Sequence, residues 1–224
     1  MWSKNAWARS LVRGLAKTPD AGSRGGAPEP SEPLAIDLPE TLHGTLVHLR
    51  PYQATDAEAV FAAIEESRAH LRPWVTWVDR FTSVEDTRAY CLRCATQWQE
   101  RTDLAVGIFD ALSGMYLGGA GLHRPDWEHR TFEVSCWLRT SAAYQGFGPE
   151  ALDLLGNLAF SSLDARQVKL LCDARNAATK RLAAKCGYVF RGSVRNGYVA
   201  PDGTLTDLLV YRLTPEDWVR IHPR

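Results

Sequence analysis

Two glycines lie two positions apart at the start of a helix-like stretch, SAAYQGFGPEALDLLGNLAF (141–160). Gly146 and Gly148 can adopt a positive φ and let backbone N–H groups turn toward a ligand. A helix N-terminus adds roughly half a positive charge, and Pro149 fits the first helical position because its missing N–H costs nothing there. The combination favours an anion-binding turn, most often one that holds a phosphate. A tight strand-to-helix turn without a ligand is the alternative interpretation.

Two common phosphate-binding motifs are absent from the chain. It contains no G-x-x-x-x-G-K-[ST] pattern, which argues against a Walker-type nucleotide site. It also contains no G-x-G-x-x-G followed by an acidic residue about 20 positions later, which argues against a dinucleotide site. These two absences leave open which ligand would carry the phosphate.

A second group suited to chemistry is Glu133, in the run FEVSCWL (132–138). A carboxylate is unusual in a strand that otherwise has the composition of a buried one. Such a group can accept a proton from a substrate, directly or through water, or bind a cationic substrate. The alternative is a glutamate on an edge strand that faces solvent.

The cysteines indicate free thiols rather than a disulfide framework or a metal site. Their odd number and irregular spacing are typical of a reducing compartment, which predicts a cytoplasmic location. Cys91 and Cys94 form a lone C-x-x-C, and zinc would need a second pair of ligands that is not obvious. We interpret these two as residues on a helix face and expect no metal. The full set is Cys91, Cys94, Cys136, Cys172 and Cys186.

The whole-chain properties narrow the class of partner. The 224 residues suit one domain, or one domain with a tail. The formal net charge is 0, so the basic excess expected of a nucleic-acid-binding protein is missing. No apolar run approaches the roughly 20 residues needed to cross a bilayer. We therefore expect neither nucleic acid nor a membrane as a partner, and a monomer or a homodimer.

The first 33 residues differ in composition from the rest. Within 1–30, five Lys or Arg residues stand against two acidic ones, and the second half is rich in Gly, Pro and Ser. This predicts a flexible basic tail over 1–33 and one domain over 34–224. The apolar core of a secretory signal is missing. A short docking helix is the alternative for the first part of the tail.

The periodicity of the domain begins with a strand and two helices. Alternation predicts a strand over 45–52. The residues Thr55-Asp56-Ala57-Glu58 have the pattern of a capping box, which predicts a helix with Thr55 as its N-cap. A loop with aromatic residues and a proline is expected over 72–78. A second helix is expected to begin at Thr82–Glu85 and to end near Glu100.

Strands dominate the sequence from residue 104 onward. Two apolar runs, 104–110 and 116–123, flank a hairpin-like turn. The helix over 149–160 should bury Ala151, Leu154, Leu155 and Leu158. Other expected elements are strands over 132–138, 168–174, 188–199 and 205–213, a helix over 177–187 ended by Gly187, and a turn at 201–203. This mixed order predicts an α/β or α+β fold around one sheet.

Several of these segments together resemble GNAT-type N-acetyltransferases. AYQGFGPEAL resembles the family's acetyl-CoA pyrophosphate loop, Q/R-x-x-G-x-G/A followed by a helix, although Ala143 occupies the first position. NAATKRLAAKCGYVFRG (176–192) is similar to the second signature, Asn-x-x-Ser/Thr with a helix and Gly-Phe/Tyr. The segment 49–78 resembles the ribosomal-protein N-terminal acetyltransferase branch, called Rim-type, and FEVSCWL lies where that branch has a strand with Glu and an aromatic residue. The resemblance covers roughly 43–218.

The resemblance implies a fold and a reaction. The fold is a mixed, largely antiparallel sheet of about six to seven strands flanked by helices. The reaction is transfer of an acetyl group from acetyl-CoA to a primary amine by direct attack in a ternary complex. The amine acceptor would be a peptide or protein N-terminus, or a small molecule. A non-catalytic module that binds acyl-CoA is the alternative.

The resemblance also assigns roles to residues. Glu133 would be the general base, and the hydroxyl of Thr179 would pass a proton to the thiolate, orient the sulfur or cap its helix. Many relatives carry a Tyr where this chain has Ala183. Asn176 would contact the cofactor, with a turn or helix cap as the alternative. The remaining cofactor-binding residues would be Trp137, Leu138, Arg139, Gln145, Gly146, Phe147 and Gly148, and Thr179 would belong with them. The acceptor side would be lined by Trp74, Trp77, His123, Trp127 and Tyr198, each of which has a core position as its alternative.

Overall fold

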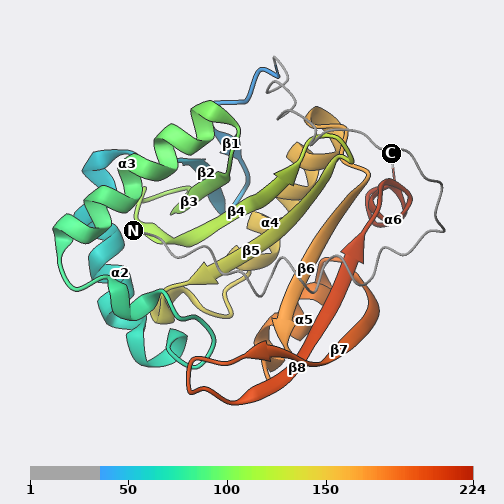
Figure 1. Cartoon of the computed structure of the whole chain (residues 1–224). Helices are drawn as coiled ribbons and strands as arrows, with labels where there is room; N and C mark the ends of the chain where they lie inside the picture. Colours follow the sequence, from blue (N-terminus) through green and yellow to red (C-terminus); the bar gives the residue numbers. More distant parts are fainter. Residues whose placement is uncertain (1–35, 224) are drawn as a thin grey trace, which may run out of the picture. The chain divides into compact units, whose positions relative to one another are not determined.

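Eight strands hydrogen-bond into one sheet in the computed structural model, which describes residues 36–223 (Figure 1). Their order is β1-β2-β3-β4-β5-β6-β8-β7, and every neighbouring pair is antiparallel except β5 and β6. The strands are β1 (Leu42–His43), β2 (Val47–Pro51), β3 (Leu104–Asp110), β4 (Tyr116–Asp126), β5 (Thr131–Leu138), β6 (Gln167–Asp173), β7 (Val189–Val199) and β8 (Leu205–Leu213). The largely antiparallel mixed sheet is confirmed. The sheet has eight strands, one more than the upper end of the predicted six to seven, because the two-residue β1 pairs with the edge of β2.

Helices cover both faces of this sheet. They are α2 (Ala57–Leu71), α3 (Val84–Glu100), α4 (Phe147–Asn157), α5 (Ala177–Lys185) and α6 (Pro215–Ile221), with a π-helical turn at Leu158–Ser162 and short 3-10 turns at Ala54–Asp56, Val78–Arg80 and Thr140–Ala142. Side chains of α4 share one core with Leu104, Val106 and Ile108 of β3. Side chains of α2 and α3 share the other core with Ala105 and Phe109. Strand β3 is therefore apolar up to its last residue, Asp110, because its two faces are both covered.

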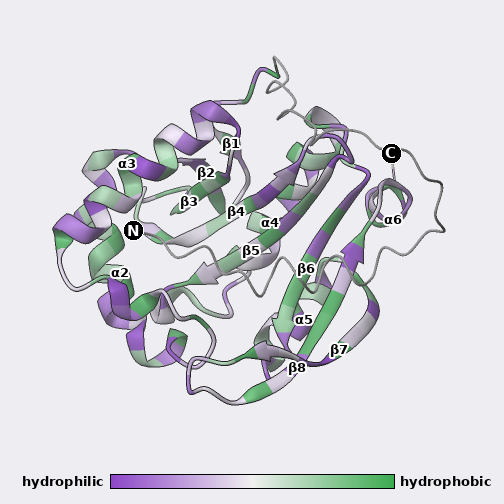
Figure 2. Ribbon diagram, viewed as in Figure 1, coloured by the Kyte–Doolittle hydropathy of each residue, from purple (hydrophilic) through white to green (hydrophobic). Residues whose placement is uncertain are grey.

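The helices themselves show the amphipathic pattern that this layering requires. Figure 2 shows hydrophilic residues interrupting the hydrophobic ones along α2 and α3. On α3, Cys91 and Cys94 are buried free thiols, which confirms them as helix-face residues. Burial raises the pKa of Cys91 to about 12 and that of Cys94 to about 11. No helix among residues 36–223 is long and apolar enough to cross a membrane.

Some helix boundaries follow the sequence pattern and one cap does not. Helix α3 begins within the expected segment Thr82–Glu85, where Ser83 is the N-cap and Asp86 N–H donates to Ser83 Oγ at 3.2 Å. Gly187, at φ 74°, follows the end of α5. The Thr55 cap is wrong, because Asp56 occupies the N-cap position of α2, where its side chain makes no bond to the helix. Its carboxylate instead accepts the Gln53 N–H at 2.7 Å and holds the 3-10 turn before α2. A charged oxygen already paired with Arg50 holds this turn more strongly than a hydroxyl would.

Helix α4 begins two residues earlier than the sequence pattern predicts. Pro149 is therefore its third residue rather than its first. The N–H groups of the whole first turn lack a partner inside a helix, so proline costs little there as well. Ala151, Leu155 and Leu158 are buried as expected, whereas Leu154 is only partly buried. The predicted tail over 1–33 lies outside the described residues.

Candidate active site

Strands β5 and β6 begin side by side and then separate. Their parallel pairing runs from Thr131 opposite Gln167 to Val134 opposite Leu170. Strand β5 continues to Leu138 and β6 to Asp173, and Figure 1 shows the two strands diverging toward these ends. Strand β4 stays paired with β5 as far as Leu138. The segment after Val134 therefore keeps a partner on one edge and loses it on the other.

The backbone direction decides which residues face the open edge of β5. Arg139 N–H donates to Leu117 O at 2.8 Å, and the close approach of Gly118 shows that Trp137 O also points toward β4. Successive residues of a strand direct their N–H and C=O groups to opposite edges. Of the three residues expected to pair with an extended cofactor arm, Leu138 thus faces the open edge, and Trp137 and Arg139 face β4.

The N-terminus of α4 lies beside this open edge. Gly146 is the N-cap at φ 93°, and no side chain of residues 36–223 caps the helix there. The amide of Gln145 donates to Ser141 O at 2.6 Å, so it stabilises the turn itself. A Cβ on Gly148 would lie 3.5 Å from Leu138 Cδ1. The unpartnered N–H groups of α4 and the unpaired edge of β5 are therefore neighbours, as an anionic group on an extended arm requires.

The two glycines of the turn have different conformations. Gly146 has a positive φ, as the sequence indicated, whereas Gly148 does not and is already helical. A Cβ on Gly148 would meet Leu138, Leu182 and Cys136 only at ordinary contact distances. Gly146 is thus required by the turn itself, and Gly148 leaves space toward β5.

Glu150 is a residue of this turn to which the sequence pattern assigned no role. Its carboxylate accepts the backbone N–H groups of Thr45, Leu46 and Val47 at 2.9, 2.7 and 2.8 Å. Because these groups belong to β2 and the loop before it, Glu150 fixes the start of α4 against a distant part of the chain. Its presence in the pyrophosphate-loop motif was the only available signal.

Asn176 and Thr179 lie together at the start of α5. Asn176 Oδ1 accepts the Thr179 N–H at 3.0 Å, which is the helix cap considered as the alternative. The Asn176 amide nitrogen and the Thr179 hydroxyl make no hydrogen bond with residues 36–223, so both are available to a ligand. Ala183 is fully buried. No tyrosine hydroxyl is therefore supplied at that position of the helix.

Glu133 is on a central strand rather than an edge strand. It lies between β4 and β6 in the sheet, opposite His123 of β4. Its Oε2 accepts from Arg124 Nη1 at 2.5 Å, and its side chain is 20% exposed. Alternation places Glu133 on the same face as Trp137, which packs in the α2–α3 core. The carboxylate is thus reachable from solvent and already has one cationic partner.

The predicted acceptor-side residues separate into two groups. Trp77 packs against Trp137 with ring centroids 5.5 Å apart, and Trp74 O accepts the Tyr198 hydroxyl at 2.8 Å. These residues join the loop after α2 to β5 and β7. Trp127 instead donates to Arg101 O at 3.0 Å and packs on Phe132 of the α4 core. Its contacts are those of a core residue.

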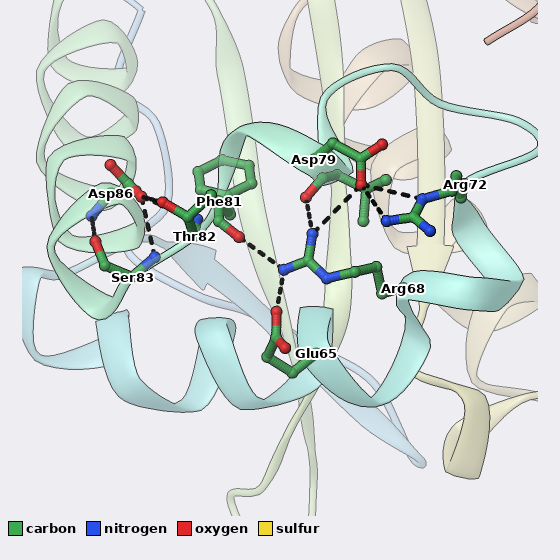
Figure 3. A network of polar contacts seen from close by, with 9 residues as sticks. Glu65, Arg68, Arg72, Asp79, Phe81, Thr82, Ser83 and Asp86 are labelled. Carbon is green, nitrogen blue, oxygen red and sulfur yellow. Dashed lines mark hydrogen bonds and ion pairs between the residues drawn. The ribbon is translucent and has the colours of Figure 1, made fainter. Parts of the chain in front are cut away.

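The loop that carries Trp74 and Trp77 is held in place by a polar network (Figure 3). Arg68 of α2 donates to Val78 O at 2.5 Å and to Phe81 O at 2.7 Å. Arg72 donates to Asp79 at 2.8 Å, and this bond lowers the pKa of the aspartate. The loop is therefore fixed by charge-assisted bonds to α2 at several points along its length.

Residues 47–189 match the model of the GNAT acetyltransferase domain, which is more than half of the chain. The chain belongs to the GNAT acetyltransferase family. No protein of curated function matches this acetyltransferase in sequence. The family assignment confirms the resemblance that the two signatures carried.

Solved structures with the same fold include Rim-type acetyltransferases. RimL, a ribosomal L7/L12 α-N-protein acetyltransferase in complex with coenzyme A, has a TM-score of 0.74 at 19% identity, over 80% of this chain and 99% of that one. RimJ of Mycobacterium smegmatis, in complex with CoA-disulfide, has a TM-score of 0.70 at 20% identity, over 80% and 90%. The microcin C7 self-immunity acetyltransferase MccE, in complex with acetyl-CoA and AMP, has a TM-score of 0.71 at 16% identity, over 76% and 93%. The GNAT acetyltransferase thus shares the fold of these enzymes.

Proposed function

We propose that this acetyltransferase moves an acetyl group from acetyl-CoA to a primary amine by direct attack within a ternary complex. The observation that carries the proposal is the position of the uncapped N-terminus of α4 beside the unpaired edge of β5. A pyrophosphate needs the first feature and an amide-containing pantetheine arm needs the second. Coenzyme A carries both groups on one molecule.

The residues present fit this cofactor in three places. The N–H groups of Gly146, Phe147 and Gly148 would hold the pyrophosphate, and the backbone of Leu138 would pair with the pantetheine arm as an added strand would. The free amide of Asn176 would contact the cofactor between these two points. When bound, acetyl-CoA supplies the thioester that is attacked. The RimL and MccE structures, which hold coenzyme A and acetyl-CoA, support the choice.

Two groups of this chain would assist the transfer, in addition to the proximity of the reactants. Binding both reactants together supplies much of the rate by proximity. Glu133 would attract a cationic acceptor and take part in its deprotonation. The Thr179 hydroxyl, which makes no bond within residues 36–223, would donate to the departing sulfur.

We favour a peptide or protein N-terminus as the acceptor. The loop carrying Trp74 and Trp77 presents aromatic rings next to β5, and aromatic faces attract apolar and cationic groups. The similarity to RimL, which acetylates a protein α-amine, supports this class. A small-molecule amine is the second class to be tested.

Binding and turnover can be measured on the full chain. Acetyl-CoA is titrated calorimetrically, and release of the thiol is followed with peptides of different N-terminal residues and with simple alkylamines. Saturable binding with amine-dependent thiol release is expected, together with a mass increase of one acetyl group on the acceptor. Tight binding without thiol release above the buffer rate would contradict the proposal and support a binding module instead.

A further inference from the structure

Three side chains outside the two signature motifs form a continuous hydrogen-bonded row. Asp103 Oδ1 lies 2.8 Å from His123 Nδ1, and His123 Nε2 lies 2.7 Å from Ser135 Oγ. An aspartate, a histidine and a serine in this order form a chain that can carry a proton from a hydroxyl to an imidazole. Of these three residues, only His123 was predicted from the sequence to have a role, as part of the acceptor side.

Strand register brings these three residues together, although Asp103 and Ser135 are 32 positions apart in the sequence. Leu104 pairs with Leu122, so Asp103 comes directly opposite His123, and His123 in turn pairs with Glu133. Ser135 lies one pleat further along β5, opposite Gly121. A Cβ on Gly121 would lie 2.8 Å from His123 Cε1. The glycine therefore lets the imidazole lean along the sheet as far as Ser135.

The row ends where the two central strands part. Ser135 is the first residue of β5 beyond the last pair, Val134 with Leu170. It is exposed, while the side chains of His123 and Asp103 are 28% and 26% exposed. Trp137, two residues further on the same face, packs against Trp77 of the proposed acceptor loop. The Ser135 hydroxyl thus faces the acceptor side at the point where the strands open.

Glu133 is less free than His123 to take a proton. Its Oε2 is engaged by Arg124, which a bulge in β4 between His123 and Asp126 places over the carboxylate. Bulges of this kind redirect side chains beside functional sites. Within residues 36–223, the charged groups near His123 are Asp103, Glu133 and Arg124, and Lys169 of β6 lies opposite Glu133. Within this set the imidazole is the base that already has a hydroxyl in contact.

We propose that His123 accepts the proton of the acceptor amine through the hydroxyl of Ser135, with Asp103 orienting the imidazole. This rests on the proposed function. The amine nitrogen forms a bond to the thioester carbonyl carbon, and the carbon–sulfur bond breaks with its electron pair leaving on sulfur. The ammonium proton passes to Ser135 Oγ as the Ser135 proton passes to His123 Nε2. Ser135 is thus a catalytic residue, and Asp103 and His123 act through it.

The hydrogen bonds of His123 predict its tautomer in the free protein, so this part of the proposal can be tested without an acceptor. If Ser135 donates to Nε2 and Nδ1–H donates to Asp103, neutral His123 carries its proton on Nδ1. In ¹⁵N spectra of the full chain, with the signals assigned through the His123→Gln variant, we expect the Nδ1–H form at neutral pH. Asp103→Asn should abolish the preference for that form, because the amide no longer requires an N–H donor.

The catalytic test compares pH profiles of kcat/KM with the amine of the panel that turns over fastest. Loss of general base catalysis typically costs about 10²- to 10⁴-fold. His123→Gln and Ser135→Ala should lower kcat within that range, leave the acetyl-CoA Kd unchanged, and remove the His-dependent limb of the profile so that only the limb of the amine remains. Ser135→Thr, which keeps a hydroxyl, should restore most of the activity.

The chain contains a matched control for this experiment. His129 also pairs with an aspartate, at 3.0 Å from Asp126, but lies on the exposed turn between β4 and β5. His129→Gln should leave the profile unchanged. Wild-type profiles in Ser135→Ala and His123→Gln, or an Nε2–H tautomer, would overturn the relay while leaving the acetyltransferase intact.

Two other outcomes distinguish a failure of the proposed proton relay from a failure of the proposed acetyl transfer to an amine. An acetyl group found on Ser135 by mass spectrometry during turnover would show a nucleophile rather than a relay, and would overturn the inference. A wild-type chain that acetylates no amine of the panel would overturn the proposed function, and the relay with it.

Discussion

The Glu150 carboxylate shows how strongly one side chain can determine the turn before α4. Three N–H groups of the 45–47 segment converge on its two oxygens, two of them on Oε2. Gly44 lies so close that a Cβ there would be 2.9 Å from Glu150 Cδ. Gly146 allows the turn its backbone conformation, whereas Glu150 determines where the turn lies.

Glu150→Gln should therefore destabilise the chain and weaken acetyl-CoA binding. An amide has one acceptor oxygen instead of two, so one N–H would face another N–H donor. Because the site is partly exposed to water, such a mismatch should cost about 1 kcal/mol. Urea unfolding and calorimetry would measure both effects, with Glu58→Gln, an exposed glutamate in the first turn of α2, as the control. Equal stability of the two variants would show that the three bonds contribute nothing.

Gly146→Ala tests the conformation of the turn rather than its position. A left-handed backbone costs a residue with a Cβ roughly 1–2 kcal/mol, and Gly146 has φ 93°. We expect this loss of stability together with weaker acetyl-CoA binding. Gly203, at φ 82° in the turn between β7 and β8, supplies the same strain with nothing within 4 Å of its Cβ. The Gly203→Ala variant should lose a similar amount of stability and bind acetyl-CoA with the wild-type Kd. A wild-type Kd for the Gly146→Ala variant would contradict the assignment of this turn as the phosphate site.

At the scale of elements, α2 is tied to the end of β5 by a second cluster of polar bonds. Arg139 Nε and Ser141 N–H each donate to Glu66 at 2.7 Å, and Thr140 N–H donates to Ser67 Oγ at 2.9 Å. These bonds fix the segment between β5 and α4, on which both the open edge and the helix N-terminus depend. The Arg139 side chain is thereby assigned a positioning role.

The bonds to Glu66 predict a pH-dependent contribution to stability. The Arg139 hydrogen bond lowers the pKa of Glu66 from 4.5 to about 2. Because the folded pKa is the lower one, the contribution is complete above about 4.5 and disappears as the pH falls toward 2. Glu66→Gln should cost about 1 kcal/mol at pH 7, allowing for solvent screening, and progressively less below pH 4.5.

The measurement is the free energy of unfolding in urea between pH 7 and pH 3. Glu65→Gln is the control, because within residues 36–223 Glu65 pairs with Arg68 of its own helix and with no other cation. Its effect should be smaller. A difference between Glu66→Gln and the unaltered chain that stays constant across this range would contradict the assignment.

At the scale of the whole described domain, the sheet separates two cores that can be perturbed independently. Helix α6 closes the α4 side, where Trp218 lies so close to Gly156 that a Cβ there would be 2.4 Å from its ring. Neither α6 nor this contact was expected from the sequence. Gly156 is in the last part of α4, far along the helix from its N-terminus.

Gly156→Ala should lower stability without affecting the cofactor site. Overpacking of a core contact costs about 1–3 kcal/mol, whereas the N-terminus of α4 keeps all its own contacts. We expect a lower Tm with an unchanged acetyl-CoA Kd, and partial recovery of the Tm when Trp218→Leu is added. A weakened Kd would instead show that displacement of α6 is transmitted along α4.

The elements themselves were largely predictable because their signals are local. The start of α3 within Thr82–Glu85, the stop at Gly187 and the apolar runs of β3 and β4 depend on residues within a few positions of each other. The Thr55 cap failed because Arg50 and Gln53 both bind Asp56, a preference the capping pattern does not contain. The two-residue β1 has too few residues to show any period.

By itself the sequence determined the family, the strand that carries Glu133 and the turn at Gly146, because motif spacing and periodicity are properties of neighbouring residues. Only the tertiary structure decided where β5 leaves β6, which backbone groups then face outward, and that Asp103, His123 and Ser135 meet. Strand register depends on pairing between segments remote in the chain, and a shift by one residue reverses every side chain. The chemistry proposed for Ser135 therefore follows from the register of three strands.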